Sequence, residues 1–213
     1  MKKLFITLAV LGIIGIIACE SGQDTTNREE SKGTTSSQKT SSYNIEDSVK
    51  VIGKKAAKAT FKALSAEVVR ALRDGGPQHA IKYCNARANP LVDSISKSLG
   101  VKISRVSHKR RNPANSANAY ERSKLIKEYI ERLKAGEKPA PVVVNVDSGY
   151  IFYAPIVIEK PLCLTCHGVV GRELSPELHE FIKQHYPTDS AYDFRMGDLR
   201  GLWKIFVPKE KVS

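Results

Sequence analysis

The chain has 213 residues and a formal net charge of +12, from 34 lysines and arginines against 22 aspartates and glutamates. This length suits one domain with one core, and no internal repeat argues for more. Since the only long apolar run is N-terminal, we expect no transmembrane helix leading to a cytoplasmic output domain.

The N-terminal residues predict export. Two lysines precede an apolar run, 4–18, which is too short for a comfortable membrane span and ends in a small residue. The ending Ile16-Ile17-Ala18-Cys19 resembles the bacterial lipobox, although Leu is usual where this chain has Ile16. We predict a lipoprotein signal peptide over 1–18 and lipidation of Cys19. An ordinary cleaved signal with an incidental cysteine is the alternative.

Residues 19–42 are predicted to be the lipidated cysteine followed by a disordered tether. Glu20 to Ser42 consist almost entirely of small polar and charged residues, which cannot bury enough apolar surface to offset the entropy of ordering. The folded domain is therefore expected over 43–213, attached to a membrane without lying in it.

The domain begins with helix-forming sequence. Apolar residues recur at three- and four-residue steps from about Ile45 to Arg73, and Asp74-Gly75-Gly76 ends the pattern. A second helix is expected from near Pro77, carrying Cys84. Asn89-Pro90 resembles an N-cap and first helical residue, which predicts a break before a further segment to about Leu99.

Strands and helices then alternate. A strand is expected over 101–107, a polar loop over 110–115, and a helix after Asn118, where Glu121 completes a capping-box pattern. The runs 141–146 and 150–158 read as a hairpin, a short helix begins at Ser175-Pro176, and a last strand covers 201–207. This order predicts an α+β fold with an antiparallel sheet and long N-terminal helices.

The most specific motif is Cys163-Leu164-Thr165-Cys166-His167, a C-x-x-C-H pattern. In an exported protein it indicates a covalent c-type haem, because each cysteine can add to a vinyl group and the histidine can ligate the iron. A zinc site would need two more ligands at suitable spacing, and a thioredoxin-like site does not normally place histidine after its second cysteine.

The second axial ligand stays open on these grounds alone. The candidates are Cys84, Met196, His79, His108, His179 and His185. Cys84 is the cysteine left over once Cys19, Cys163 and Cys166 are assigned, and its alternative role is that of a small core residue.

Four motifs occur in the order found in a bacterial family of single c-type haem domains of unknown function. They are Ala80-Ile81-Lys82-Tyr83-Cys84-Asn85, Arg111-Asn112-Pro113-Ala114-Asn115, Cys163-Leu164-Thr165-Cys166-His167-Gly168 and Gly197-Asp198-Leu199-Arg200-Gly201. The similarity spans about Ile45 to Val207. It implies a PAS-like α+β domain with one covalent haem, and similarity to a cyanobacterial relative implies that Cys84 is the second axial ligand beside His167.

Three further residues are candidates for binding the haem propionates: Arg105, Arg111 and Asn112. Arginine binds carboxylates through two parallel hydrogen bonds, whereas the alternative is that all three are solvated strand-end and loop residues.

These observations predict a membrane-tethered, exported monohaem cytochrome that faces the periplasm or cell exterior. We expect it to transfer single electrons to an unidentified redox partner, or to sense redox state or a small gas. The alternative is a haem enzyme such as a peroxidase with an open or displaceable distal ligand. The basic charge suits propionates, acidic redox partners and headgroups, and we expect no nucleic-acid partner.

Overall fold

The computed structural model describes the backbone of residues 37–212 and the side chains of residues 45–212. The predicted signal peptide, Cys19 and most of the predicted tether therefore lie outside the described residues. Residues 37–42 of that tether are helical, since the first helix begins at Ser37. Within the described part of the chain, no helix has the length and apolarity needed to cross a membrane.

The long element α1 (Ser37–Leu99) is two helices joined at a sharp turn. Gly75 and Gly76 are its only non-helical residues, and Gly76 has a φ of 73°, a left-handed conformation that glycine adopts without strain. The helix therefore ends after Asp74, as the sequence predicts, and resumes at Pro77.

The predicted break at Asn89-Pro90 is wrong, because the second helix runs unbroken through Pro90 to Leu99. Proline leaves only the carbonyl of Ala86 without its helical donor, and Ala86 is exposed, so water can satisfy that carbonyl. Val92, just beyond the proline, is buried in the core.

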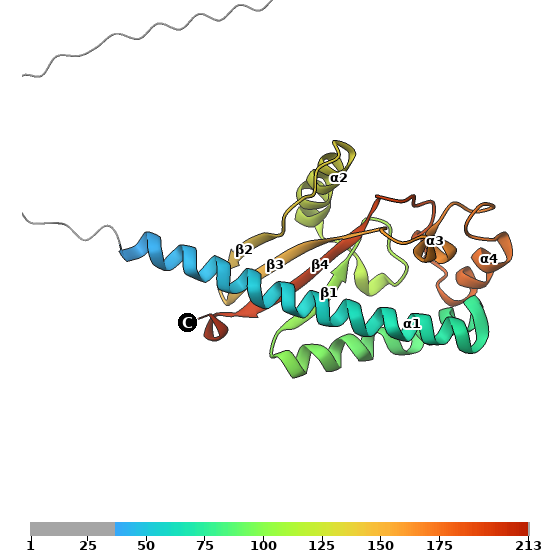
Figure 1. The fold of residues 1–213 in the computed structure, drawn as a ribbon, viewed down its shortest axis with the longest axis horizontal. Coiled ribbons are helices and arrows are strands. Elements are labelled where there is room, and N and C mark those ends of the chain that lie inside the picture. The colour runs from blue at the N-terminus through green and yellow to red at the C-terminus, as the bar shows by residue number, and fades with distance from the viewer. Residues whose placement is uncertain (1–36, 213) are drawn as a thin grey trace, which may run out of the picture. The chain divides into compact units, whose positions relative to one another are not determined.

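The sheet has four antiparallel strands in the order β1-β4-β3-β2 (Figure 1). The strands are β1 (Lys102–Val106), β2 (Val142–Val146), β3 (Gly149–Val157) and β4 (Leu199–Pro208). Strands β2 and β3 form the expected hairpin, and β3 pairs with the C-terminal strand β4. The predicted α+β class with an antiparallel sheet and long N-terminal helices is confirmed.

Side chains that alternate along β3 and β4 fill two cores on opposite faces of the sheet. Phe152 and Ile205 pack with Val49 and Ala56 of α1 on one face. Tyr153 and Leu202 belong to a second cluster. Leu125, Ile126 and Tyr129 join it from the π-helical turn η2 (Glu121–Ile126) and from α2 (Lys127–Lys134), which cover this face of the sheet.

The predicted capping box at the start of η2 is present. The Asn118 backbone N–H donates to Glu121 Oε2 at 2.8 Å, and the Glu121 N–H donates to Asn118 Oδ1 at 2.8 Å. Glu121 is buried and also meets the Lys204 ammonium at 2.6 Å and the Tyr153 hydroxyl at 3.0 Å. This network ties η2 to β3 and β4.

Two short helices, α3 (Pro161–His167) and α4 (Pro176–His185), lie at the end of the sheet where α1 turns back (Figure 1). Helix α3 is the C-x-x-C-H motif itself. Helix α4 packs on the second half of α1 through Leu178, Ile182 and Ile81.

Candidate functional site

The cysteines of the motif occupy one helical segment that begins with Pro161, a residue suited to the first turn of a helix. Cys163 packs in a small core with Ile158, Leu164 and Phe194, whereas Cys166 packs beside Ile81 and Leu178. Both are free thiols, as is Cys84. Helix α3 therefore presents two thiols that are not in disulfides, about one helical turn apart.

The histidine of the motif is oriented by the loop that follows α4. His167 Nδ1 lies 2.7 Å from the carbonyl oxygen of Ala191, and since a carbonyl only accepts, the proton is on Nδ1. Burial, reinforced by Arg200 and Arg111, lowers the pKa of His167 well below its ordinary value. The imidazole is thus neutral at pH 7, and Nε2 has its lone pair free for a metal.

Arg111 holds the same loop against the motif helix. Its guanidinium donates to the Cys166 carbonyl at 2.7 Å and pairs with the fully buried Asp189 at 3.3 Å. Asp189 Oδ1 in turn accepts from the Ala191 N–H at 2.9 Å. Arg111, predicted as a propionate partner, therefore makes contacts that fix the carbonyls around His167.

The second helix of α1 brings Cys84 to this site from some eighty residues upstream. Burial raises the pKa of the Cys84 thiol, against the opposing effect of the nearby Arg105 and Arg111. The pKa of Cys166 is likewise raised, chiefly by burial, and Cys84 and Cys163 add to the effect. Ile81, one turn before Cys84 on the same helix, packs in the cluster that Cys166 joins, so this part of α1 lies against the motif helix.

Side-chain contacts between the two halves of α1 hold the helical turn that carries Cys84 in place. The Tyr83 hydroxyl donates to Glu67 Oε2, the same oxygen that Arg70 Nη2 meets at 2.5 Å. The Arg70 guanidinium also lies 5.5 Å from the centre of the Tyr83 ring. The residue next to Cys84 is therefore tied to the preceding helix.

Among the described residues, Arg105, Arg111 and Arg200 share the site with one buried carboxylate, Asp189. Burial and the proximity of the other two arginines lower the pKa of Arg200 to about 9. Its Nε is buried without a hydrogen-bond partner, while Nη1 donates to Ser107 Oγ at 3.1 Å. The Arg105 side chain makes no hydrogen bond or ion pair with the described residues. The site thus has an excess of positive charge and unused donors, which suits an anion.

Sequence reasoning missed Arg200, Asp189 and Ala191 as parts of this site. Arg200 lies inside one of the four family motifs, which is the one signal that marks it. Asp189 and Ala191 belong to a loop of irregular sequence that carries no pattern. Asn112 is a helix cap, because its side-chain oxygen accepts from the Ala114 N–H at 2.9 Å.

The other candidates for a second axial ligand have different surroundings. Met196 is 48% exposed and His79 is exposed, while His185 Nδ1 lies 2.9 Å from the Phe181 carbonyl. His179 packs edge-on against Tyr192, and His108 contacts Phe194 with ring centres 6.1 Å apart. Phe194 and Tyr192 belong to the clusters that Cys163 and Cys166 join, and among the described residues His108 Nδ1 and His179 Nε2 are buried without a hydrogen-bond partner.

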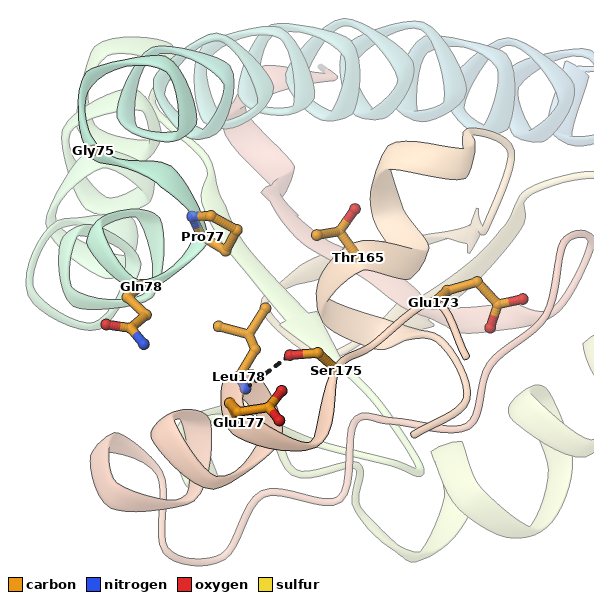
Figure 2. A pocket seen from close by; sticks show the side chains of 8 residues that line it. All are labelled: Gly75, Pro77, Gln78, Thr165, Glu173, Ser175, Glu177 and Leu178. Carbon is orange, nitrogen blue, oxygen red and sulfur yellow. Dashed lines mark hydrogen bonds between the residues drawn. The ribbon is translucent and has the colours of Figure 1, made fainter. Parts of the chain in front are cut away.

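A hollow of about 450 Å³ adjoins the motif helix (Figure 2). Pro77, Thr165 and Leu178 face it from the turn of α1, from α3 and from α4. Thr165 is the only motif residue that lines it, so the hollow borders the cluster of cysteines, His167 and arginines without containing it.

Comparisons with known proteins found one matching family and a similar fold. The model of a family described as Tll0287-like matches residues 23–208. The crystal structure of the cyanobacterial haem protein Tll0287 is similar in fold, with a TM-score of 0.50 and 22% identity over 72% of this chain and 92% of that one. No curated protein sequence matches.

Proposed function

The chain belongs to the Tll0287-like family, and from that premise we propose that it is a c-type cytochrome. In this proposal Cys163 and Cys166 attach one haem through thioether bonds, and His167 and Cys84 are its axial ligands. The haem serves one-electron transfer, or the sensing of redox state or a small gas, in a protein exported and anchored through a lipid on Cys19.

The residues present fit a haem. Two free thiols on one helical segment are what attachment to two vinyl groups needs, and each addition places S–H across a C=C bond without any oxidant. His167 is held as the Nδ1–H tautomer by Ala191, which leaves Nε2 for iron.

The charges of the site support the same ligand. The arginines and nearby lysines outnumber the one buried carboxylate, Asp189, and the propionates of a haem would offset part of this positive charge. Arg105 and Arg200 have donors to spare, so we assign propionate binding to them before Arg111, whose contacts are to Asp189 and Cys166.

The observation that carries the axial assignment is the partly buried Cys84 thiol, one helical turn from Ile81, which packs in the cluster that Cys166 joins. Burial raises the pKa of this thiol despite the nearby Arg105 and Arg111, so a thiolate is still costly there, and iron would supply further positive charge. A thiolate ligand also donates electron density to iron and lowers its potential. With both axial positions filled by protein, electron transfer or ligand-exchange sensing is favoured over catalysis at an open iron.

Spectra of the full protein test the axial assignment. Absorption and EPR spectra of the wild type are expected to show low-spin iron with thiolate ligation, and Cys84→Ser is expected to change both. The matched control is Met196→Leu, at the other sulfur-bearing candidate, which should leave the spectra unaltered. Unchanged spectra in Cys84→Ser would rule out the assignment.

Carbon monoxide binding separates a capped iron from an open one. The reduced wild-type protein should bind carbon monoxide weakly or slowly, and Cys84→Ser should bind it readily. Rapid carbon monoxide binding by the wild type, together with peroxidase turnover, would instead support the alternative of a haem enzyme with an open distal position.

Covalent attachment and anchoring have their own readouts. Haem should stay on the polypeptide under denaturing conditions, and a Cys163→Ser/Cys166→Ser variant should lose it. A labelled fatty acid should be incorporated into the wild type but not into Cys19→Ser. Release of haem from the denatured wild type would disprove the attachment, and label in Cys19→Ser would disprove the lipid site.

A further inference from the structure

The first half of α1 has a face that the protein core does not use. Its buried face, with Val49, Gly53, Ala56 and Thr60, packs toward the sheet. Residues about half a turn away are exposed, and they include four lysines and three large apolar residues. We name these the lysine face: Lys54, Lys55, Lys58, Lys62, Val51, Phe61 and Val69.

Four cations of this face have no ion-pair partner within the described part of the chain. No aspartate or glutamate occurs between Asp47 and Glu67, a stretch that holds five lysines. Lys54, Lys55, Lys58 and Lys62 form no ion pair with any described residue, whereas Lys50 pairs with Glu46 at 2.7 Å. The field of the four lysines is therefore available to an outside anion.

The apolar residues of the face are also unusually exposed. Val51 is 67% exposed, Phe61 48% and Val69 50%. They are three of the six large hydrophobic side chains exposed among the described residues. Their spacing interleaves them with the lysines along about 27 Å of one helix face.

This combination favours a lipid surface over other anions. Lysine stems can lie along apolar side chains while their ammonium groups reach phosphate oxygens, and valine and phenylalanine gain by entering the boundary between headgroups and acyl chains. A nucleic-acid backbone would leave Val51 and Val69 in water, whereas the boundary of an anionic bilayer accommodates apolar side chains and lysines on the same helix face.

We propose that the lysine face of α1 docks flat on an anionic lipid bilayer, with Val51, Phe61 and Val69 entering the interface and the four lysines binding lipid phosphates. The surface is separate from the cysteine and arginine site, so the proposal stands whether or not the chain binds haem. It also places a contact with lipid within the folded domain, apart from any lipid on Cys19.

Vesicle flotation tests this surface in the full chain carrying Cys19→Ser, which removes lipidation at that residue. Vesicles of phosphatidylcholine with roughly one third phosphatidylglycerol should bind the protein, vesicles of phosphatidylcholine alone should not, and about 0.5 M salt should weaken binding. Lys54→Glu/Lys58→Glu/Lys62→Glu should lower the partition coefficient on the order of a hundredfold.

The matched control reverses three exposed lysines elsewhere, Lys124→Glu/Lys134→Glu/Lys138→Glu, with the same change in net charge. It should retain most of the binding, and circular dichroism should show both triple variants folded. Equal losses in the two variants would mean that only net charge matters and would overturn the proposal. So would binding to nucleic acid or to an acidic protein without binding to anionic vesicles.

Fluorescence of Phe61→Trp gives a second measurement. The natural Trp203 is buried, so a change on adding vesicles reports on the new residue. A blue shift with anionic vesicles, and quenching by brominated acyl chains, are expected. An unshifted spectrum in vesicle-bound protein would exclude insertion of this face.

Discussion

Arg111 shows how one side chain can organise a site without being a ligand of it. Its guanidinium joins the end of the motif helix to the loop that orients His167, through the Cys166 carbonyl and the buried Asp189. Arginine suits this role because its planar fork donates in several fixed directions at once, which lysine cannot do.

Arg111→Lys is therefore expected to lower the free energy of unfolding by about 2 kcal/mol, because Asp189 keeps a cation nearby but loses its fixed donors. Urea unfolding measures the change. Arg195→Lys, at an exposed position of the same region, is the control and should be close to neutral. An equal effect of the two substitutions would show that the Asp189 contacts contribute nothing.

At the scale of elements, α1 determines how closely a helix approaches the sheet and where Cys84 lies. Gly53 faces the ring of Phe152 so closely that an added Cβ would overlap the ring carbons. The turn at Gly75 and Gly76 then reverses the chain so that the second half, with Cys84, meets α3 and α4.

Gly53→Ala should destabilise the protein by about 1–3 kcal/mol through overpacking, although alanine is the better helix former by about 1 kcal/mol. Thermal unfolding of Gly53→Ala, Phe152→Leu and the double variant forms a cycle. The double variant should lose less stability than the sum of the two singles. A higher melting temperature for Gly53→Ala would show that the helix can move away at no cost.

For the whole molecule, the buried carboxylate of Glu121 couples stability to pH. Burial alone would raise its pKa, but hydrogen bonds from Lys204, the Asn118 backbone and Tyr153 outweigh it and hold the pKa below 4.5. A carboxyl whose pKa falls on folding contributes stability above its unfolded pKa. That contribution is lost as the pH falls through the folded value.

Glu121→Gln should thus cost about 3 kcal/mol at neutral pH, because Lys204 loses its buried partner. Its stability should also change less than that of the wild type between pH 5 and strongly acidic conditions, roughly pH 2. Urea midpoints across this range measure both effects, with the exposed Glu128→Gln as control. Parallel pH profiles for wild type and Glu121→Gln would contradict this account.

Local sequence patterns predicted much of this fold. The end of the first helix at Asp74, the capping box at Asn118 and Glu121, and the hairpin all depend on neighbours a few residues apart, whereas the first helix begins at Ser37, earlier than the expected Ile45. The helical run through Pro90 was missed because it depends on solvent reaching the Ala86 carbonyl and on Val92 packing in the core, neither of which is a local property.

For the site, the sequence by itself determined which chemical groups are present: two cysteines and a histidine at fixed spacing, and a spare thiol at Cys84. Only the tertiary structure decided that Arg111 binds Asp189, that Ala191 orients His167, and that Arg105 and Arg200 keep free donors. The separation of groups a few residues apart is set by the regular geometry of the helix that carries them. The pairing of groups eighty residues apart depends on how α1, the sheet and the 189–194 loop pack together.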